Sequence, residues 1–113
     1  MKKQIKLFDP IIDDNELHIL ERTLKSKSWA DGSGSKQVIK FEEEFQKETD
    51  SDSNIAVNSG TAALHLALSM ENIRNKEVIL PSMSFVSTAH AIIANNAKPI
   101  FADIDLDTLC FDP

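Results

Sequence analysis

The spacing of hydrophobic residues in the first half of the chain predicts two amphipathic helices. Apolar side chains recur there every three or four positions, which places them on one face of a helix and leaves the charged residues on the other. Asp13 or Asp14 is placed to cap the first helix, and the glycine-rich stretch 31–35 breaks the chain after it. The apolar positions that define these helices are Leu17, Leu20 and Leu24 for the first and Val38, Phe41 and Phe45 for the second.

The second half of the chain has a different pattern, in which short apolar runs alternate with helical stretches. Strands that alternate with helices in this way predict an α/β fold with a parallel sheet and right-handed crossover connections. The change of pattern predicts an amino-terminal helical segment at 1–53 and the start of an α/β domain at 54–113. The predicted strands are Ile55–Val57, Glu77–Leu80 and Pro99–Ala102, and the predicted helices are Thr61–Met70 and Phe85–Ala94.

The carboxyl ends of the predicted strands carry the most polar or unusual segments of this half: Asn58–Thr61, Ser82–Phe85 and Asp103–Asp105. Because ligands of open α/β sheets bind outside the carboxyl ends of the strands, we expect a binding site at this edge. A buried parallel sheet also needs both faces covered, and the helices predicted here cover only part of it. The chain is therefore expected to be the front part of a larger protein.

One turn in this half has the pattern of an anion site. Ser59, Gly60 and Thr61 stand between an apolar run and the start of a predicted helix. The unpaired N–H groups of a helix start, together with the helix dipole, attract phosphate, and a glycine permits close approach to the main chain. The alternative interpretation is a serine-capped helix with a glycine turn and no ligand.

The net charge and the cysteine content limit which binding partners and which cellular compartment are expected. The formal net charge is −6, from 18 acidic and 12 basic residues, which argues against nucleic-acid or anionic-membrane binding. The single cysteine, Cys110, permits no intrachain disulfide; it favours a reducing cytoplasm and is interpreted as a packing residue. No apolar segment is long enough to cross a bilayer, and no export signal is predicted, because charged residues interrupt the region after the basic start.

Some other residues have potential chemistry. His18, His65 and His90 all fall inside predicted helices, where histidine is usually a packed or half-exposed residue, and they are given no role. Asp103 and Asp105 could suggest a metal site or an acid–base pair.

Several segments, in order, resemble the amino-terminal part of the DegT/DnrJ/StrS-type sugar aminotransferases. These are pyridoxal-phosphate enzymes of the aspartate-aminotransferase fold (fold type I), so the resemblance implies the start of their large domain. It covers nearly the whole chain from about Asp9 onward, including Thr108 and Asp112-Pro113. The matching segments are Trp29–Gly34, Phe41–Phe45, Asn58–Leu64, Glu77–Ser82, Ser84–Ala89 and Pro99–Asp105.

The resemblance implies roles for four residues toward pyridoxal 5'-phosphate. Gly60, Thr61 and Ala62 match the family's turn that holds the cofactor phosphate, and Phe85 matches the aromatic residue that stacks on the pyridine ring. A core aromatic at a helix start is the alternative for Phe85. The resemblance also implies that Asp103 and Asp105 belong to a turn at the end of a strand and not to a catalytic pair, so no metal site is predicted. The segment Trp29–Gly34 matches one that lies near the active site or dimer interface in the family, or else is a helix-ending anchor and a loop.

The resemblance also implies what this chain lacks. Covalent pyridoxal catalysis needs a lysine amine and a carboxylate that keeps the pyridine nitrogen protonated. In the family both lie beyond the matched region, and none of the lysines here occupies the Schiff-base motif. This chain alone is therefore expected to have no turnover.

The expected function of the parent protein, a homodimer, is to transfer an amino group from an amino acid, with glutamate as the expected donor, to a nucleotide-linked keto sugar. A pyridoxal-dependent sugar dehydratase of the same family is an alternative, distinguished by the residue at the lysine position. A non-catalytic truncated product or a small anion-binding module is another. A dinucleotide-binding domain is disfavoured because no G-x-G-x-x-G follows the first predicted strand.

Overall fold

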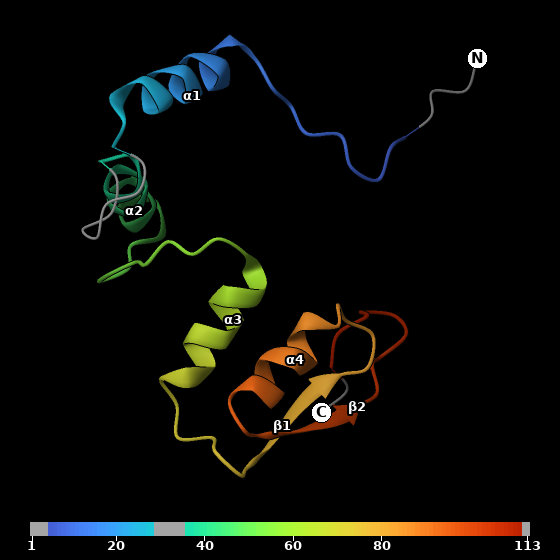
Figure 1. The fold of residues 1–113 in the computed structure, drawn as a ribbon. Coiled ribbons are helices and arrows are strands. Elements are labelled where there is room, and N and C mark those ends of the chain that lie inside the picture. Colours follow the sequence, from blue (N-terminus) through green and yellow to red (C-terminus); the bar gives the residue numbers. More distant parts are fainter. Residues whose placement is uncertain (1–4, 29–35, 112–113) are drawn as a thin grey trace. The chain divides into compact units, whose positions relative to one another are not determined.

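A computed structural model describes residues 5–28 and 36–111 of the chain (Figure 1). The chain divides into two compact units, residues 1–56 and residues 57–113, and each is described by itself. The segment Trp29–Gly34 and the closing Asp112-Pro113 lie outside the described residues. The division into domains at 1–53 and 54–113 concerns the whole protein and stays a prediction.

The first unit contains the two predicted amphipathic helices, α1 (Asp14–Ser26) and α2 (Lys36–Thr49). Of the two candidate caps, Asp13 is the residue used. Its carboxylate accepts a hydrogen bond from the Asn15 N–H at 2.7 Å, while Glu16 reaches back to the Asp13 N–H at 2.8 Å. This reciprocal capping box satisfies two N–H groups that a helix start leaves unpaired, and the Asn15 bond lowers the pKa of Asp13. The helix ends at Ser26, and its C-cap residue Lys27 has a left-handed φ of 57°.

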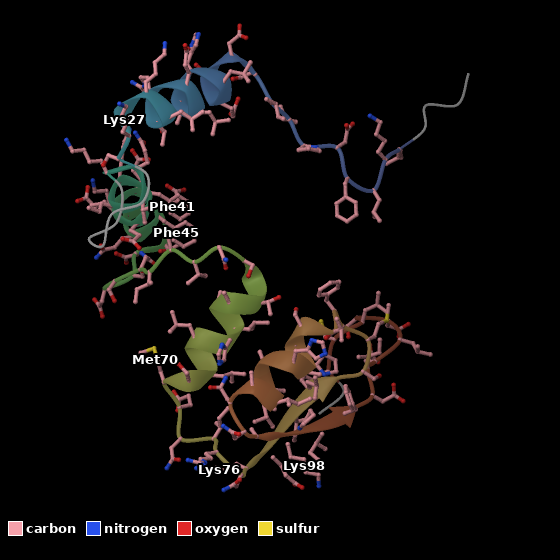
Figure 2. All side chains as sticks on the ribbon, viewed as in Figure 1. Lys27, Phe41, Phe45, Met70, Lys76 and Lys98 are labelled. Atoms are coloured by element: carbon pink, nitrogen blue, oxygen red, sulfur yellow. The ribbon has the colours of Figure 1, made fainter. Side chains whose placement is uncertain are left out.

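The apolar stripe of α2 is marked by Phe41 and Phe45, whose rings stack with centroids 5.7 Å apart (Figure 2). The chain after α2 is hydrogen-bonded back to side chains of the helix. The Glu42 carboxylate accepts a hydrogen bond from the Ala56 N–H at 2.7 Å, and Gln46 donates to the Asp52 carbonyl at 2.6 Å. Glu42 thus has a specific structural partner, although the sequence indicated only a solvated acidic face.

The second unit contains α3 (Gly60–Ser69), β1 (Glu77–Pro81), α4 (Ser87–Ala94) and β2 (Lys98–Ala102). β1 and β2 pair in parallel, with Glu77 opposite Lys98 and Pro81 opposite Ala102. The helix α4 makes the crossover between them, as Figure 1 shows. The predicted α/β class with parallel strands and a crossover helix is therefore confirmed.

The core of this unit forms where α4 packs on the sheet. Leu80 on β1, Ile92 on α4 and Ala97 just before β2 are all buried and in one cluster. Partly buried apolar side chains from α3, β1, α4 and the loop before β1 pack around this cluster: Leu68, Ile73, Val78 and Ala89. Burial of these side chains holds the crossover helix against the sheet.

The predicted strand Ile55–Val57 is wrong for this structure. The segment forms no strand, and the Ile55 side chain is 71% exposed. A strand exists only when a neighbour completes its ladder of hydrogen bonds, and within the described residues the sheet consists of β1 and β2 alone. The apolar run therefore remains without regular structure, and the predicted three-strand edge is reduced to two strands.

Two further expectations need correction. The helix predicted from Phe85 begins at Ser87, because Phe85 and Val86 lead into the first turn, where the Thr88 N–H donates to the Phe85 carbonyl at 3.0 Å. Cys110, interpreted as a packing residue, is exposed. It lies in the loop after β2, where Ile104 and Phe111 form an isolated antiparallel bridge.

A paired substitution on α4 tests the position of the core. Ile92 is 2% exposed, whereas its neighbour Ile93 is 55% exposed. We expect Ile92→Val to lower the free energy of unfolding by about 0.5–1.5 kcal/mol, because a buried methylene is lost and a small cavity remains. Urea denaturation followed by circular dichroism measures the change. The control Ile93→Val should shift the midpoint far less, and equal shifts would contradict this core.

Candidate functional site

The start of α3 carries the predicted anion-binding turn. Ser59 is the N-cap in extended backbone conformation, and its hydroxyl oxygen accepts a hydrogen bond from the Ala62 N–H at 3.2 Å. The same hydroxyl donates to the Asn58 side-chain oxygen at 3.3 Å. Ser59 is therefore engaged in fixing the helix start, and the capping predicted by the simpler interpretation is present.

Capping does not use all the donors of this turn. The first four N–H groups of an α-helix have no intrahelical acceptor, and here the Ser59 hydroxyl takes one of them, that of Ala62. The N–H groups of Gly60 and Thr61 remain at the positive end of the helix dipole. An anion at this turn would therefore be held first by Gly60 and Thr61, and Ala62 would have to share its N–H with the cap.

Gly60 faces open space. A Cβ placed on it would meet no heavy atom within 4 Å. Its backbone is outside the left-handed region, so neither strain nor a steric clash within the described residues requires a glycine here. The residue leaves room for a ligand to approach the main chain, so the turn fits the phosphate of a cofactor.

A hollow of about 270 Å³ lies beside this turn, between α3 and α4. His65 on α3 and His90 on α4 line this hollow together with Thr61. The Asn95 side chain links the two helices, because it donates hydrogen bonds to the His65 carbonyl at 3.1 Å and to the Ala91 carbonyl at 2.9 Å. The full lining is Ser59, Thr61, Ala62, His65, His90, Ala91 and Ala94.

From the sequence, His65 and His90 were assigned no role, and their position beside the Ser59–Thr61 turn was not predicted. One signal was available for His65, because it follows Thr61 by four residues and side chains at that spacing share a helix face. No comparable signal existed for His90, because its position depends on how α4 packs against α3.

Phe85 lies on the loop between β1 and α4, just past the carboxyl end of β1, and is 78% exposed. The alternative of a core aromatic is therefore wrong within the described residues. The structure brings Gly60, Thr61 and Ala62 together in one turn and places Phe85 on a separate element of the same unit. Its predicted stacking on a cofactor ring stays a prediction.

The loop after β2 forms a turn that is held by its own hydrogen bonds, and Asp103 and Asp105 lie in it, as expected. The Asp105 carboxylate accepts hydrogen bonds from the N–H groups of Thr108 at 2.8 Å and Asp107 at 3.1 Å. The Thr108 bond holds the pKa of Asp105 below its usual value, so the carboxylate stays charged and unsuited to accept a proton near neutral pH. Nor do the described residues contain a cluster of three or more side chains suited to hold a metal ion.

The lysines of this unit lie at the other end of the sheet. Lys76 and Lys98 stand at the amino ends of β1 and β2, as Figure 2 shows, and Lys98 pairs with Glu77 at 2.9 Å. Phe85 follows the carboxyl end of β1 instead. Neither lysine is placed at the loops where the ligand is expected. Among the described helices, none has the length and apolar character to span a membrane.

Comparison with known proteins now identifies the class. Residues 10–113 match the model of the DegT/DnrJ/EryC1/StrS aminotransferase family. The chain belongs to this family, and the predicted resemblance is confirmed. Its fold is part of the large domain of a fold-type-I pyridoxal-phosphate enzyme, the class of its solved neighbours.

The individual relatives are sugar-modifying enzymes and related proteins. The chain is 43% identical over 105 residues to the spore coat polysaccharide biosynthesis protein SpsC of Bacillus subtilis, covering 92% of this chain and 26% of SpsC. It is 40% identical to the L-glutamine:2-deoxy-scyllo-inosose aminotransferase of Streptomyces kanamyceticus, covering 88% of this chain and 25% of that enzyme.

Among solved structures, the PLP-form of the putative sugar aminotransferase Spr1654 of Streptococcus pneumoniae superposes with a TM-score of 0.86 at 28% identity. The match covers 97% of this chain and 28% of that one. The chain therefore spans about a quarter of the length of the proteins it resembles.

The cap of α3 can be tested by removing its hydroxyl. We expect Ser59→Ala to destabilise the helix start by about 1 kcal/mol, because the Ala62 N–H loses its acceptor. Amide hydrogen exchange of Ala62 and Ala63, followed by NMR, measures the effect. The control Ser69→Ala removes a hydroxyl at the other end of α3, where it donates to the Leu66 carbonyl. If exchange at Ala62 were unchanged in Ser59→Ala, the cap would be contradicted.

Proposed function

We propose that this chain is the amino-terminal part of a pyridoxal-phosphate-dependent aminotransferase that transfers an amino group from glutamate to a nucleotide-linked keto sugar. The observation that carries the proposal is the start of α3. It combines a family-matched Ser-Gly-Thr turn, two N–H groups beyond the cap, and open space at Gly60. The parent is proposed to be a cytoplasmic homodimer.

The residues present would bind and orient the cofactor. The N–H groups of Gly60 and Thr61, with the Thr61 hydroxyl, would hold its phosphate, and Ala62 would join them by sharing its N–H. The exposed ring of Phe85 would lie against the pyridine ring and exclude water from one of its faces. When bound, pyridoxal phosphate stores the amino group between the two halves of the transfer. The lysine and the carboxylate that this chemistry requires would come from outside these 113 residues.

The names of several relatives support the choice of substrates. One, 34% identical, is a UDP-4-amino-4-deoxy-L-arabinose–oxoglutarate aminotransferase of Shewanella sediminis, and another, 37% identical, is a dTDP-4-dehydro-2,3,6-trideoxy-D-glucose 4-aminotransferase of Saccharopolyspora spinosa. These names pair a nucleotide sugar with amino transfer, and the first includes oxoglutarate, the product that glutamate leaves after giving up its amino group.

A second pair of substrates is favoured by the relative from Streptomyces kanamyceticus, whose name joins L-glutamine with 2-deoxy-scyllo-inosose, an acceptor named without a nucleotide. The sugar dehydratase alternative differs at the lysine position, and the residues of this chain do not separate it from an aminotransferase. A non-catalytic product would share the fold and the turn but not the activity.

The glycine of the turn provides a direct test of cofactor binding. We expect pyridoxal phosphate to shift the backbone amide NMR signals of Gly60 and Thr61 in the 113-residue chain. Gly60→Ala should weaken this binding severalfold, because the added methyl group occupies the space where the phosphate would approach. The fold should not suffer, since that methyl group meets no atom within 4 Å. Equal binding by the wild-type chain and Gly60→Ala would contradict the proposal.

Pyridoxal without its phosphate is the matched ligand control for this titration. It presents the same ring and lacks the anion, so it should leave the signals of Gly60 and Thr61 in place. Shifts of equal size with pyridoxal would show that the turn does not recognise phosphate.

A further inference from the structure

The helix α3, which carries the candidate phosphate turn, is anchored in the core of its unit near its carboxyl end. All its residues, Gly60–Ser69, are described, and none of them is buried. Within this unit the helix packs against α4, and Leu68 is its residue in the core cluster (Figure 1). Gly60 stands two turns of helix before Leu68, about 12 Å away along the helix axis. The core therefore holds the end of α3 that lies away from the turn.

The amino-terminal half of α3 is not closely packed against α4. The hollow of about 270 Å³ lies at this level, with Thr61 and His65 on one side and His90 and Ala94 on the other. Two helices with a hollow between them lose the side-chain contacts that would fix one against the other. Packing alone therefore does not fix the turn relative to α4.

The side chain of Asn95 forms a hydrogen bond between the helices at this level. Asn95 is the C-cap residue of α4, and its side-chain amide carries two N–H donors. One donates at 2.9 Å to the Ala91 carbonyl, which belongs to the last turn of α4, where carbonyls lack intrahelical donors. The other donates at 3.1 Å to the His65 carbonyl of α3. Among the described residues, no other hydrogen bond joins α3 to α4 and its cap.

The two bonds have different effects. The bond to Ala91 stays within the end of α4, so it favours one rotamer of Asn95 and directs the second N–H toward α3. The bond to His65 joins residues 30 positions apart in the chain. His65 follows Thr61 by one turn of helix, so this bond attaches α3 close to the phosphate turn. Together with Leu68 it gives the helix two separate attachments, which restrict pivoting about either one.

The position of α3 relative to α4 also sets the position of the turn relative to Phe85. Phe85 leads into α4, and its carbonyl accepts a hydrogen bond from the Thr88 N–H at 3.0 Å. Gly60 and Thr61 begin α3. A cofactor that contacts the start of one helix with its phosphate and the segment before the other helix with its ring requires a fixed relation between the two.

We propose that Asn95 is a positioning residue for cofactor binding: by linking α3 to α4, it fixes Gly60 and Thr61 relative to Phe85. The inference rests on the function proposed above, from which it takes the phosphate and ring contacts. Asn95 acts through α3 and need not touch the cofactor. Because the link is present before the cofactor arrives, less conformational freedom is lost on binding.

The orientation of the two helices can be measured without cofactor. Residual dipolar couplings of backbone N–H groups in the 113-residue chain report the direction of α3 relative to α4. We expect one rigid arrangement in the unsubstituted chain. In Asn95→Ala the couplings of α3 should shrink relative to those of α4, because the helix pivots about Leu68.

A second variant, Asn95→Asp, keeps the size of the side chain and removes its N–H donors, so it should loosen α3 in the same way. Circular dichroism checks that both variants remain folded. Couplings of α3 that stay as in the unsubstituted chain would overturn the inference.

Cofactor binding is measured by the shifts of the Gly60 and Thr61 amide signals on addition of pyridoxal phosphate. Asn95→Ala should weaken this binding about two- to tenfold, which corresponds to the net contribution of one hydrogen bond. The matched control is Ile92→Val, which lowers the stability of the same helix and leaves both Asn95 bonds in place. It should bind like the unsubstituted chain.

An equal loss of binding in Ile92→Val would overturn the inference, because affinity would then follow stability and not the link between the helices. Absence of binding by the unsubstituted chain would contradict the proposed function instead. The dipolar couplings distinguish the two failures, since they test the link with no cofactor present.

Discussion

The packing of α4 against the β1–β2 pair is the interaction on which the rest of the second unit depends. Leu80, Ile92 and Ala97 meet beneath the helix, and their burial holds the crossover connection in place. Because this connection makes the strands parallel, their carboxyl ends meet at one edge. The loops that carry Phe85 and Asp105 begin at that edge, so a small apolar cluster sets the position of polar and aromatic groups outside it.

The start of α3 combines a helix cap with the free N–H groups of a candidate anion site. A helix start must satisfy its free N–H groups, and an anion site must leave some of them free. Ser59 caps Ala62 and no more, while Gly60 keeps the approach to the remaining donors open. The capping interpretation and the phosphate interpretation of Ser-Gly-Thr are therefore compatible, because the cap uses only the Ala62 N–H and leaves those of Gly60 and Thr61 for an anion.

Local patterns predicted the elements whose stability is local. The apolar run before Pro81 and the helical spacing of Leu17, Leu20 and Leu24 gave β1 and α1, and a serine before a glycine gave the cap of α3. Family membership rested on several short motifs in order, and the family comparison confirmed it.

Features that depend on distant partners were not predictable in the same way. The run Ile55–Val57 has the composition of a strand, but strand formation requires a partner that the described residues do not provide. The placement of His90 beside Thr61 follows from the packing of two helices, which no spacing in the sequence encodes.

The proposal that underlies the others is that this chain would hold the phosphate of the cofactor, while the lysine that reacts with the cofactor would come from outside these 113 residues. Borohydride treatment of the 113-residue chain with pyridoxal phosphate, followed by peptide mapping, tests it most directly. We expect slight, scattered labelling, because none of the lysines of this chain matches the family's Schiff-base motif, and Lys76 and Lys98 lie at the far end of the sheet. Stoichiometric labelling of a single lysine would contradict it.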